Sequence, residues 1–273
     1  MREIDVRHLG APRVICCHEI DGYIVDPGPE VSHHTLVEAL GGEPPRAILL
    51  THIHFDHAGA AGALVRRWPD VEVWVHERGA RHMADPSRLV ASARRLYGDD
   101  FDDLWGEVVP IPERNLRVLT GGESIEGFRV EYTPGHAKHH VAYLHEATGT
   151  AYCGDVAGVR IGDGPIMPPT PPPDIDLEAW HDSVDVIADW DPERLAITHF
   201  GTFEGDVQTH LAVLHEGLYL WGELARHVDE ITYAEAVKRR FAHSRDAKSF
   251  MQAAPPSTLW SGLHRYWSQW DVS

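Results

Sequence analysis

The amino-acid sequence predicts an α/β (α+β) fold followed by a helical C-terminal part. Short apolar segments bounded by turn residues recur between residues 13 and 198, and several of them alternate with segments that carry helix start and stop signals. After Phe203 the strand-like segments end and helical patterns follow one another. With 273 residues the chain can bury one large core together with a helical appendage. We therefore expect a main domain over residues 1–203, and a helical extension over residues 204–273 that packs on it or helps to build a substrate pocket.

The first half of the chain is expected to alternate strands with helices. Ser32 can cap a helix that ends near Leu40 at two glycines, and residues 58–68 form a second helical pattern that ends at Pro69. Two helical stretches, around residues 79–83 and 87–97, lead into an irregular acidic segment, residues 98–112, which we expect outside the central sheet. The expected strands cover residues 13–17, 23–25, 47–50 and 71–75.

The second half begins with another series of strands and ends in helices. Expected strands cover residues 117–119, 128–132, 141–145 and 151–153, with a hairpin turn at residues 146–149. Six prolines make residues 162–174 a stiff, extended loop. A helix over 177–189 and a strand over 195–198 follow, and then helices over 207–227, 233–240 and 257–270.

One face of the last expected helix is strongly apolar. It carries Trp260, Leu263, Trp267 and Trp270 at positions i, i+3, i+7 and i+10. We expect this face to pack against the core. The alternatives are a wall of a substrate pocket or the seam of a homodimer.

The overall charge and the cysteine count narrow the possible classes of function. With 24 basic and 42 acidic residues the formal net charge is −18, and such a surface repels the phosphate backbone of nucleic acids. The three cysteines form no CxxC pair, which favours a reducing cytoplasm. The first ten residues lack the apolar stretch of a secretory signal, and no apolar run approaches the roughly 18 residues of a membrane-spanning helix. We therefore expect a cytoplasmic protein with neither a nucleic-acid nor a membrane partner.

The 20 histidines are unusual, and three of them cluster directly after an expected strand. Residues 47–50 lead into the loop His52-x-His54-x-Asp56-His57, which places three imidazoles and one carboxylate within six residues. Alternate residues of an extended loop point to opposite sides, so His52 and His54 can meet one metal ion while Asp56 and His57 turn to another. The spacing therefore predicts a metal site.

Three more candidate ligands follow later strands. His136 comes after residues 128–132, Asp155 after residues 151–153, and His199 after residues 195–198. Ligands of an α/β protein gather at the ends of its strands, so these residues can join the first cluster.

The ordered motifs resemble the metallo-β-lactamase superfamily from about residue 23 to residue 201. The match consists of Asp26 after an early strand, the HxHxDH run, a later His, an Asp and a final His. The resemblance implies a four-layer αβ/βα sandwich with the site at one edge between two sheets. It also implies two divalent metal ions, zinc foremost, with iron or a mixed Fe/Zn pair as alternatives. The implied ligands are His52, His54 and His136 for one ion and Asp56, His57 and His199 for the other, with Asp155 bridging.

The resemblance also implies roles for residues around the ligands. Asp56 would orient the attacking hydroxide and accept its proton, and Asp26 would support the ligands from behind. His140 matches the outer histidine of the TPGHxxxH pattern of glyoxalase-II-like relatives, where it lies behind the ligands or faces substrate. His210 could approach the pocket because the chain has just left His199. We expect a solvated turn at Lys138 and His139, with lining of the pocket as the alternative. Surface positions are expected for His33, His34, His82, His145, His215, His243 and His264.

Glyoxalase-II-like and lactonase-like members resemble the chain most. The implied activity is hydrolysis of an ester-type bond in a small molecule, such as a lactone, carboxylic ester or thioester, with promiscuous phosphotriester cleavage, through a metal-bridging hydroxide. Residues 156–160 lack the elements usual in glyoxalase II, which disfavours glutathione recognition. The alternatives are an iron-dependent sulfur dioxygenase-like oxidoreductase on the same fold, which would use one iron, and a metal-binding protein without catalysis.

Overall fold

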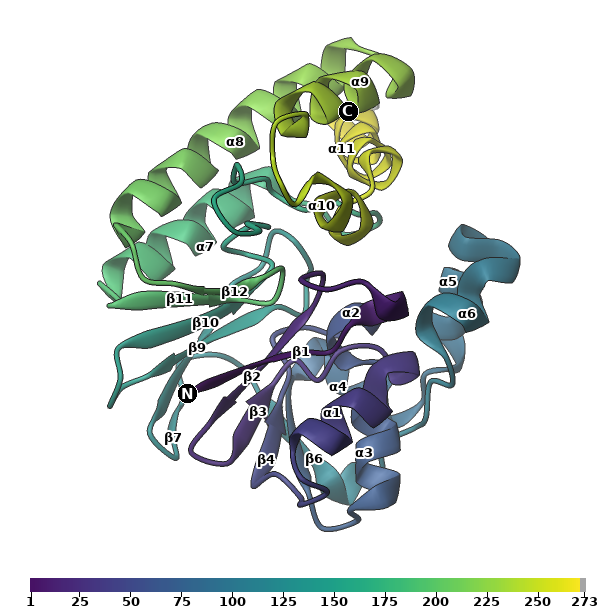
Figure 1. Ribbon diagram of the computed structural model, residues 1–273, viewed down its shortest axis with the longest axis vertical. Coiled ribbons are helices and arrows are strands. Elements are labelled where there is room, and N and C mark those ends of the chain that lie inside the picture. Colours follow the sequence, from purple (N-terminus) through teal and green to yellow (C-terminus); the bar gives the residue numbers. More distant parts are fainter. Residues whose placement is uncertain (271–273) are drawn as a thin grey trace.

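Two six-stranded sheets lie face to face in the computed structural model, which describes residues 1–270 (Figure 1). The first sheet has its strands in chain order, antiparallel from β1 to β3 and parallel from β3 to β6. These strands are β1 (Arg2–Asp5), β2 (Cys16–Ile20), β3 (Tyr23–Val25), β4 (Ala47–Leu49), β5 (Glu72–His76) and β6 (Leu116–Leu119).

The second sheet has the order β12-β11-β10-β9-β8-β7. Its neighbouring strands run antiparallel, except that β10 and β11 are parallel. The strands are β7 (Ser124–Ile125), β8 (Phe128–Tyr132), β9 (Val141–His145), β10 (Thr150–Gly154), β11 (Arg194–Ile197) and β12 (Gly201–Phe203).

Helices cover the outer face of each sheet, which confirms the predicted four-layer sandwich. On the first sheet lie α1 (His33–Ala39), α3 (Ala61–Arg67) and α4 (Glu77–Ala84), and on the second lie α7 (Leu177–Asp189) and α8 (Val207–His227) (Figure 1). Alternation along the strands explains the layers, because successive side chains point to opposite faces. In β5, for example, Trp74 lies between the sheets, whereas Val73 and Val75 face the helices.

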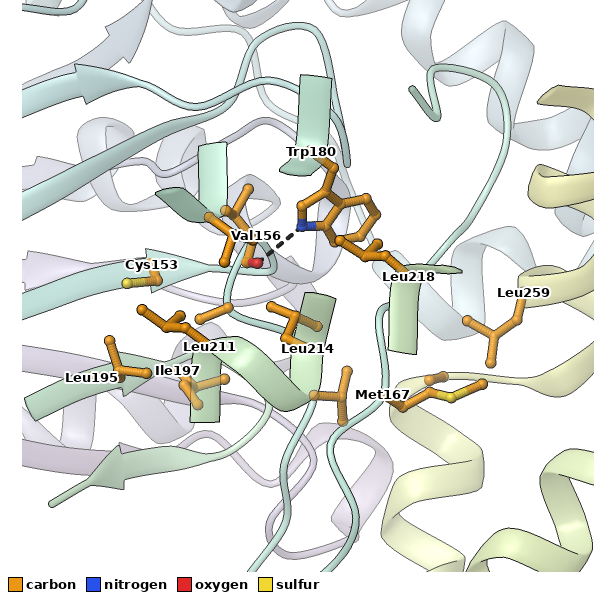
Figure 2. Packing of buried hydrophobic residues seen from close by; sticks show 14 of the residues in the cluster. Cys153, Val156, Met167, Trp180, Leu195, Ile197, Leu211, Leu214, Leu218 and Leu259 are labelled. Carbon is orange, nitrogen blue, oxygen red and sulfur yellow. Dashed lines mark hydrogen bonds between the residues drawn. The ribbon is translucent and has the colours of Figure 1, made fainter. Parts of the chain in front are cut away.

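The outer layer of the second sheet is continuous with the C-terminal helices α9 (Glu230–Phe241), α10 (Ala247–Ala253) and α11 (Pro256–Trp270). Figure 2 shows side chains from β10, β11, α7, α8 and α11 in this one cluster. Trp180 lies fully buried in it, and its Nε1 donates a hydrogen bond to the Val156 carbonyl at 2.9 Å. The expected packing of α11 is present: Leu263 is buried, and Trp267 donates to the Gly222 carbonyl. The side chain of Trp270 lies outside the described residues, and the domain boundary at residue 203 stays a prediction.

Several elements match their predicted bounds, and others differ for identifiable reasons. Strands β3, β8 and β9 and helices α7 and α8 begin and end where the sequence predicts. The strand expected at 13–17 begins only at Cys16, because Arg13 has a left-handed φ of 57° that breaks the extended chain. Ser32 makes no side-chain cap; a short 3-10 turn, Glu30–Ser32, runs directly into α1.

The helix predicted at 58–68 begins only at Ala61, as α3, and a separate short helix, α2 (Phe55–Ala58), precedes it. Between the two helices Gly59 lies against Pro29 and Glu30, and a Cβ there would come within 2.5 Å of the Phe55 carbonyl oxygen. The acidic segment expected to be irregular contains helix α6 (Phe101–Trp105), which follows α5 (Ser87–Tyr97). Phe101 and Trp105 anchor α6 because both are buried against Phe55. Within the described residues, no helix is long and apolar enough to cross a bilayer.

Candidate metal centre

All the predicted ligands lie shortly after the carboxyl ends of strands. His52 and His54 follow β4, and Asp56 and His57 occupy α2 directly behind them. The other three follow strands of the second sheet: His136 after β8, Asp155 after β10 and His199 after β11. The structure brings these seven side chains together at one edge of the two sheets, as the strand-end argument predicts.

The first group of ligand atoms belongs to His52, His54 and His136. Nδ1 of His54 lies 2.9 Å from Nε2 of His52 and 3.0 Å from Nε2 of His136. The second group belongs to Asp56, His57 and His199. Its Asp56 Oδ2 lies 3.3 Å from His199 Nε2 and 3.8 Å from His57 Nε2.

Asp155 lies between the two groups and divides its oxygens between them. Its Oδ2 is 3.3 Å from His136 Nε2 in the first group. Its Oδ1 is 3.3 Å from His57 Nε2 and 3.5 Å from His199 Nε2 in the second. This is the arrangement that a bridging carboxylate requires.

The donor set fits divalent cations. Ligands about 2.0–2.1 Å from a tetrahedral zinc ion lie about 3.3 Å from one another, and the spacings here bracket that value. His57 Nε2 and Asp155 Oδ1 are buried without a hydrogen-bond partner in the described part of the chain, a costly state for polar atoms unless they bind a cation. Imidazole and carboxylate donors suit zinc and iron alike. The clusters are therefore compatible with a dinuclear site, whereas the donor types leave the metal open.

Hydrogen bonds behind the ligands orient them. Asp26, fully buried, accepts from Nδ1 of His57 at 2.8 Å, from the hydroxyls of Thr51 and Thr198 at 2.7 Å each, and from the Thr51 backbone N–H at 2.9 Å. Because a carboxylate can only accept, the His57 proton lies on Nδ1, and Nε2 is left for the cluster.

Two other ligands are held in the same way through the backbone. Nδ1 of His136 donates to the Pro169 carbonyl at 2.8 Å, and Nδ1 of His199 donates to the Val14 carbonyl at 2.7 Å. Carbonyl oxygens only accept, so both rings present Nε2 to the cluster. The proline-rich loop and the segment before β2 therefore help to set the geometry of the site.

The histidines of the two groups differ in the direction in which their pKa values are shifted. Burial, reinforced by neighbouring imidazoles, lowers the pKa of His52 and brings the pKa of His54 to about 3, which keeps both rings in the neutral form that ligates metals. Burial opposes the charged form of His57 too, but Asp155, Asp56 and Asp26 outweigh it and raise the pKa of His57. The carboxylates thus draw positive charge to the second group, whether protons or a divalent ion.

A cavity of about 430 Å³ opens onto the cluster. His54, Asp56, Asp155 and His199 line its floor, and His54 and Asp56 are the two ligands that remain half-buried rather than buried. Five of the seven clustered side chains are buried, and the two half-buried ones line this cavity, where a substrate can reach them.

A family model described as the metallo-beta-lactamase superfamily matches residues 14–199, the segment that contains all seven clustered side chains. The chain belongs to the metallo-beta-lactamase superfamily.

Relatives of this superfamily member share its fold and part of its length. The metallo-beta-lactamase fold-containing protein ST1585 of Sulfurisphaera tokodaii is 27% identical over 161 residues, 56% of this chain and 60% of that protein. The ST1585 crystal structure has a TM-score of 0.72 at 21% identity, covering 96% of this chain and 97% of its own. A hydroxyacylglutathione hydrolase of Thermosynechococcus vestitus is 34% identical over 136 residues, 48% of this chain but only 42% of the hydrolase. TTHA1623, crystallised in a di-iron-bound form, has a TM-score of 0.52 at 26% identity, covering 71% of this chain and 92% of its own.

Two weaker predictions fall on residues away from the cavity surface. His140 lies behind the ligands: its ring stacks on His52 with centroids 5.1 Å apart, and its Nδ1 is 2.8 Å from the Thr133 hydroxyl. His210 is buried beneath the chain that follows Asp155, where its Nε2 donates to the Ala157 carbonyl at 2.8 Å. Neither side chain is among the described residues that line the cavity, so the structure offers no support for substrate contact by either.

Sequence reasoning missed several residues of the site. The expectation of a solvated turn is wrong for His139, which is buried and lines the cavity, and the expected surface position is wrong for His145, which is buried. His82 is half-buried and also lines the cavity. Thr51 and Thr198 were also missed, although each directly precedes a clustered histidine at a strand end, a repeated signal that could have found them. His8 had no such signal, because tertiary structure alone brings it to the cavity.

Proposed function

We propose that this metallo-beta-lactamase superfamily member is a metal-dependent hydrolase of an ester-type bond in a small molecule. The observation that carries the proposal is the pair of ligand groups with Asp155 between them, beside a cavity that His54, Asp56, Asp155 and His199 line. The partial match to hydroxyacylglutathione hydrolases supports hydrolysis of this kind of bond. Lactones, carboxylic esters and thioesters are the substrates in view, with phosphotriesters as promiscuous ones.

In this proposal one divalent ion is held by His52, His54 and His136, and the other by Asp56, His57 and His199, with Asp155 shared. Zinc is the expected metal, and iron or a mixed Fe/Zn pair are the alternatives. Two bound ions would lower the pKa of a water molecule and polarise the carbonyl or phosphoryl oxygen under attack.

Asp56 is the side chain that would act on the attacking water. Its Oδ2 faces His57 and His199, and its side chain is 22% exposed on the cavity side. Burial would raise the pKa of Asp56, but the charges of His57 and His199 and a hydrogen bond from His199 outweigh it and hold the carboxyl ionised. Its Oδ1 can then orient the attacking water and accept its proton.

The test joins metal content to a substrate screen on one sample of the full chain. Elemental analysis is expected to give about two ions per chain. The metal-loaded protein is expected to hydrolyse at least one of the p-nitrophenyl esters, lactones, thioesters or phosphotriesters, and a chelator is expected to abolish this activity. A protein with one iron that consumes oxygen with a persulfide and hydrolyses none of these compounds would overturn the proposal in favour of a sulfur dioxygenase.

A further inference from the structure

The cavity above the metal centre is lined without cationic side chains. Among the described residues, no Lys or Arg lines it, whereas the carboxylate Asp174 does so near its rim, in addition to Asp56 and Asp155 on the floor. Cations that contact lining residues do so from outside the lining: Lys138 pairs with Asp174 at 3.2 Å, Nε of Arg81 donates to His82 at 3.2 Å, and Nε of Arg265 donates to the Pro173 carbonyl at 3.3 Å. A carboxylate at the distal end of a substrate would therefore find no positive partner inside the cavity.

The lining histidines away from the metal centre do not supply that charge either. Burial lowers the pKa of both His8 and His82. Nε2 of His8 is committed to the Leu104 carbonyl at 2.9 Å, and its ring stacks on Trp105. At neutral pH these rings are uncharged surface of the cavity.

One side of the cavity is an aromatic wall formed by Phe55, Tyr97 and Trp105, extended by Leu89 and Leu104. These residues support one another, since Tyr97 meets Trp105 edge-on at 5.3 Å and Phe55 lies 6.2 Å from the same ring. Edge-to-face packing of this kind fixes ring orientation. The wall is therefore a preformed apolar surface.

A second part of the lining is a proline wall formed by residues 171–173 together with residues 253–255 and Leu259. The Thr170 hydroxyl donates to the Leu259 carbonyl at 2.8 Å. At Gly262 an added Cβ would come within 1.9 Å of the Thr170 carbonyl oxygen, so α11 packs tightly against this loop. Two apolar walls thus flank the route to the metal centre.

We propose that the substrate is an uncharged ester, thioester or lactone with an apolar acyl or leaving group, and that the site discriminates against substrates with a distal carboxylate. This inference rests on the proposed hydrolase function. Apolar groups gain by leaving water for the two walls, whereas a carboxylate would lose its hydration without a compensating cation. Its approach would also be opposed by the net charge of −18.

The experiment compares matched substrates with the metal-loaded full chain. Across p-nitrophenyl acetate, butyrate and hexanoate, kcat/KM is expected to rise about four-fold per added methylene. The mono-p-nitrophenyl ester of hexanedioic acid, in which a carboxylate replaces the terminal methyl group of the hexanoyl chain, is expected to give a kcat/KM about 100-fold below that of the hexanoate. Values within three-fold of each other would overturn this inference and leave the hydrolase proposal standing. Turnover of none of the compounds screened would overturn both.

A pair of lysine substitutions on α5 provides the matched control. Ser92 is exposed and lines the cavity, whereas its neighbour Ala91 is exposed and does not line it. Ser92→Lys is expected to raise kcat/KM for the carboxylate ester about ten-fold relative to the neutral ester, and Ala91→Lys is expected to leave that ratio unchanged. An unchanged ratio in Ser92→Lys, or equal changes in both variants, would contradict the proposed basis of selectivity.

Discussion

Replacing Asp26 by Asn tests whether a single buried carboxylate orients the metal centre. Its Oδ2 accepts three hydrogen bonds, from His57, Thr51 and Thr198, and its Oδ1 accepts the Thr51 backbone N–H. If the amide nitrogen took the place of Oδ2, His57 would have to move its proton to Nε2, the atom that faces Asp155. If it took the place of Oδ1, it would meet a backbone donor that cannot turn away.

Either orientation costs a buried hydrogen bond and the negative charge that polarises His57. A hydrogen bond to a charged group contributes about 1.5–3 kcal/mol, and loss of such support behind a ligand weakens metal affinity about 10–100-fold. We therefore expect Asp26→Asn to bind metal about 10–100-fold more weakly than the unmodified chain.

To measure this change in affinity, protein freed of metal by a chelator would be titrated with the metal in a calorimeter, in the presence of a second chelator that competes for the metal. Thr198→Val is the matched control, since it removes one donor to Oδ2 but no charge, and its expected loss of affinity is under about ten-fold. A folded Asp26→Asn variant with undiminished metal affinity would refute the reasoning.

Four further predictions probe catalysis, core and pH response. Asp56→Asn should lower the hydrolytic rate about 100-fold or more and leave the circular dichroism spectrum unchanged, and full activity would contradict its role. Trp180→Ala should lower the free energy of unfolding in urea by about 3–5 kcal/mol, because the side chain is fully buried. Tyr143→Phe should lower the free energy of unfolding by about 1–3 kcal/mol, because it leaves the buried Leu50 carbonyl unpaired. Tyr152→Phe should be nearly neutral, since the Tyr152 hydroxyl is buried without a partner in the described chain. Equal losses of stability in the two variants would contradict this reasoning. Burial lowers the pKa of His210 from 6.5 to about 4, so as the pH falls the unfolded chain binds a proton at this residue before the folded chain does. The stability present above pH 6.5 is therefore lost as the pH falls towards 4, and at pH 5 the free energy of unfolding should be lower by about 2 kcal/mol. Unfolding curves of His210→Gln should lack this loss.

The clustering of the candidate ligands could be predicted from the sequence because their signals are local. Four of them lie within six residues after one apolar strand, and each of the others follows an apolar strand of its own. The unbroken apolar run Val73-Trp74-Val75 is likewise typical of a strand buried on both faces. Such features depend on short stretches of chain, so they can be recognised in the sequence before the fold is known.

The cavity could not be predicted, because its walls join segments far apart in the chain. His8 contacts Leu104 and Gln252, which are 96 and 244 residues away, and none of the three belongs to a recognisable pattern. Strand β1 was missed for a similar reason: four residues with one buried side chain, Ile4, become a strand only by pairing with β2. Tertiary context decides these elements, whereas local pattern decides the ligands.

Both ligand groups depend on contact between the two sheets. Each takes two side chains from the segment after β4 in the first sheet and one from the second sheet, namely His136 or His199. The sheets are tied together beside these ligands, where the Val141 N–H donates to the Thr51 carbonyl at 2.8 Å and the Cys16 N–H donates to the Thr198 carbonyl at 2.8 Å. Neither sheet alone carries three ligands of one group together with Asp155. Metal affinity in this protein is therefore a property of the docked sheets, and any change that loosens their contact should weaken metal binding before it removes a ligand.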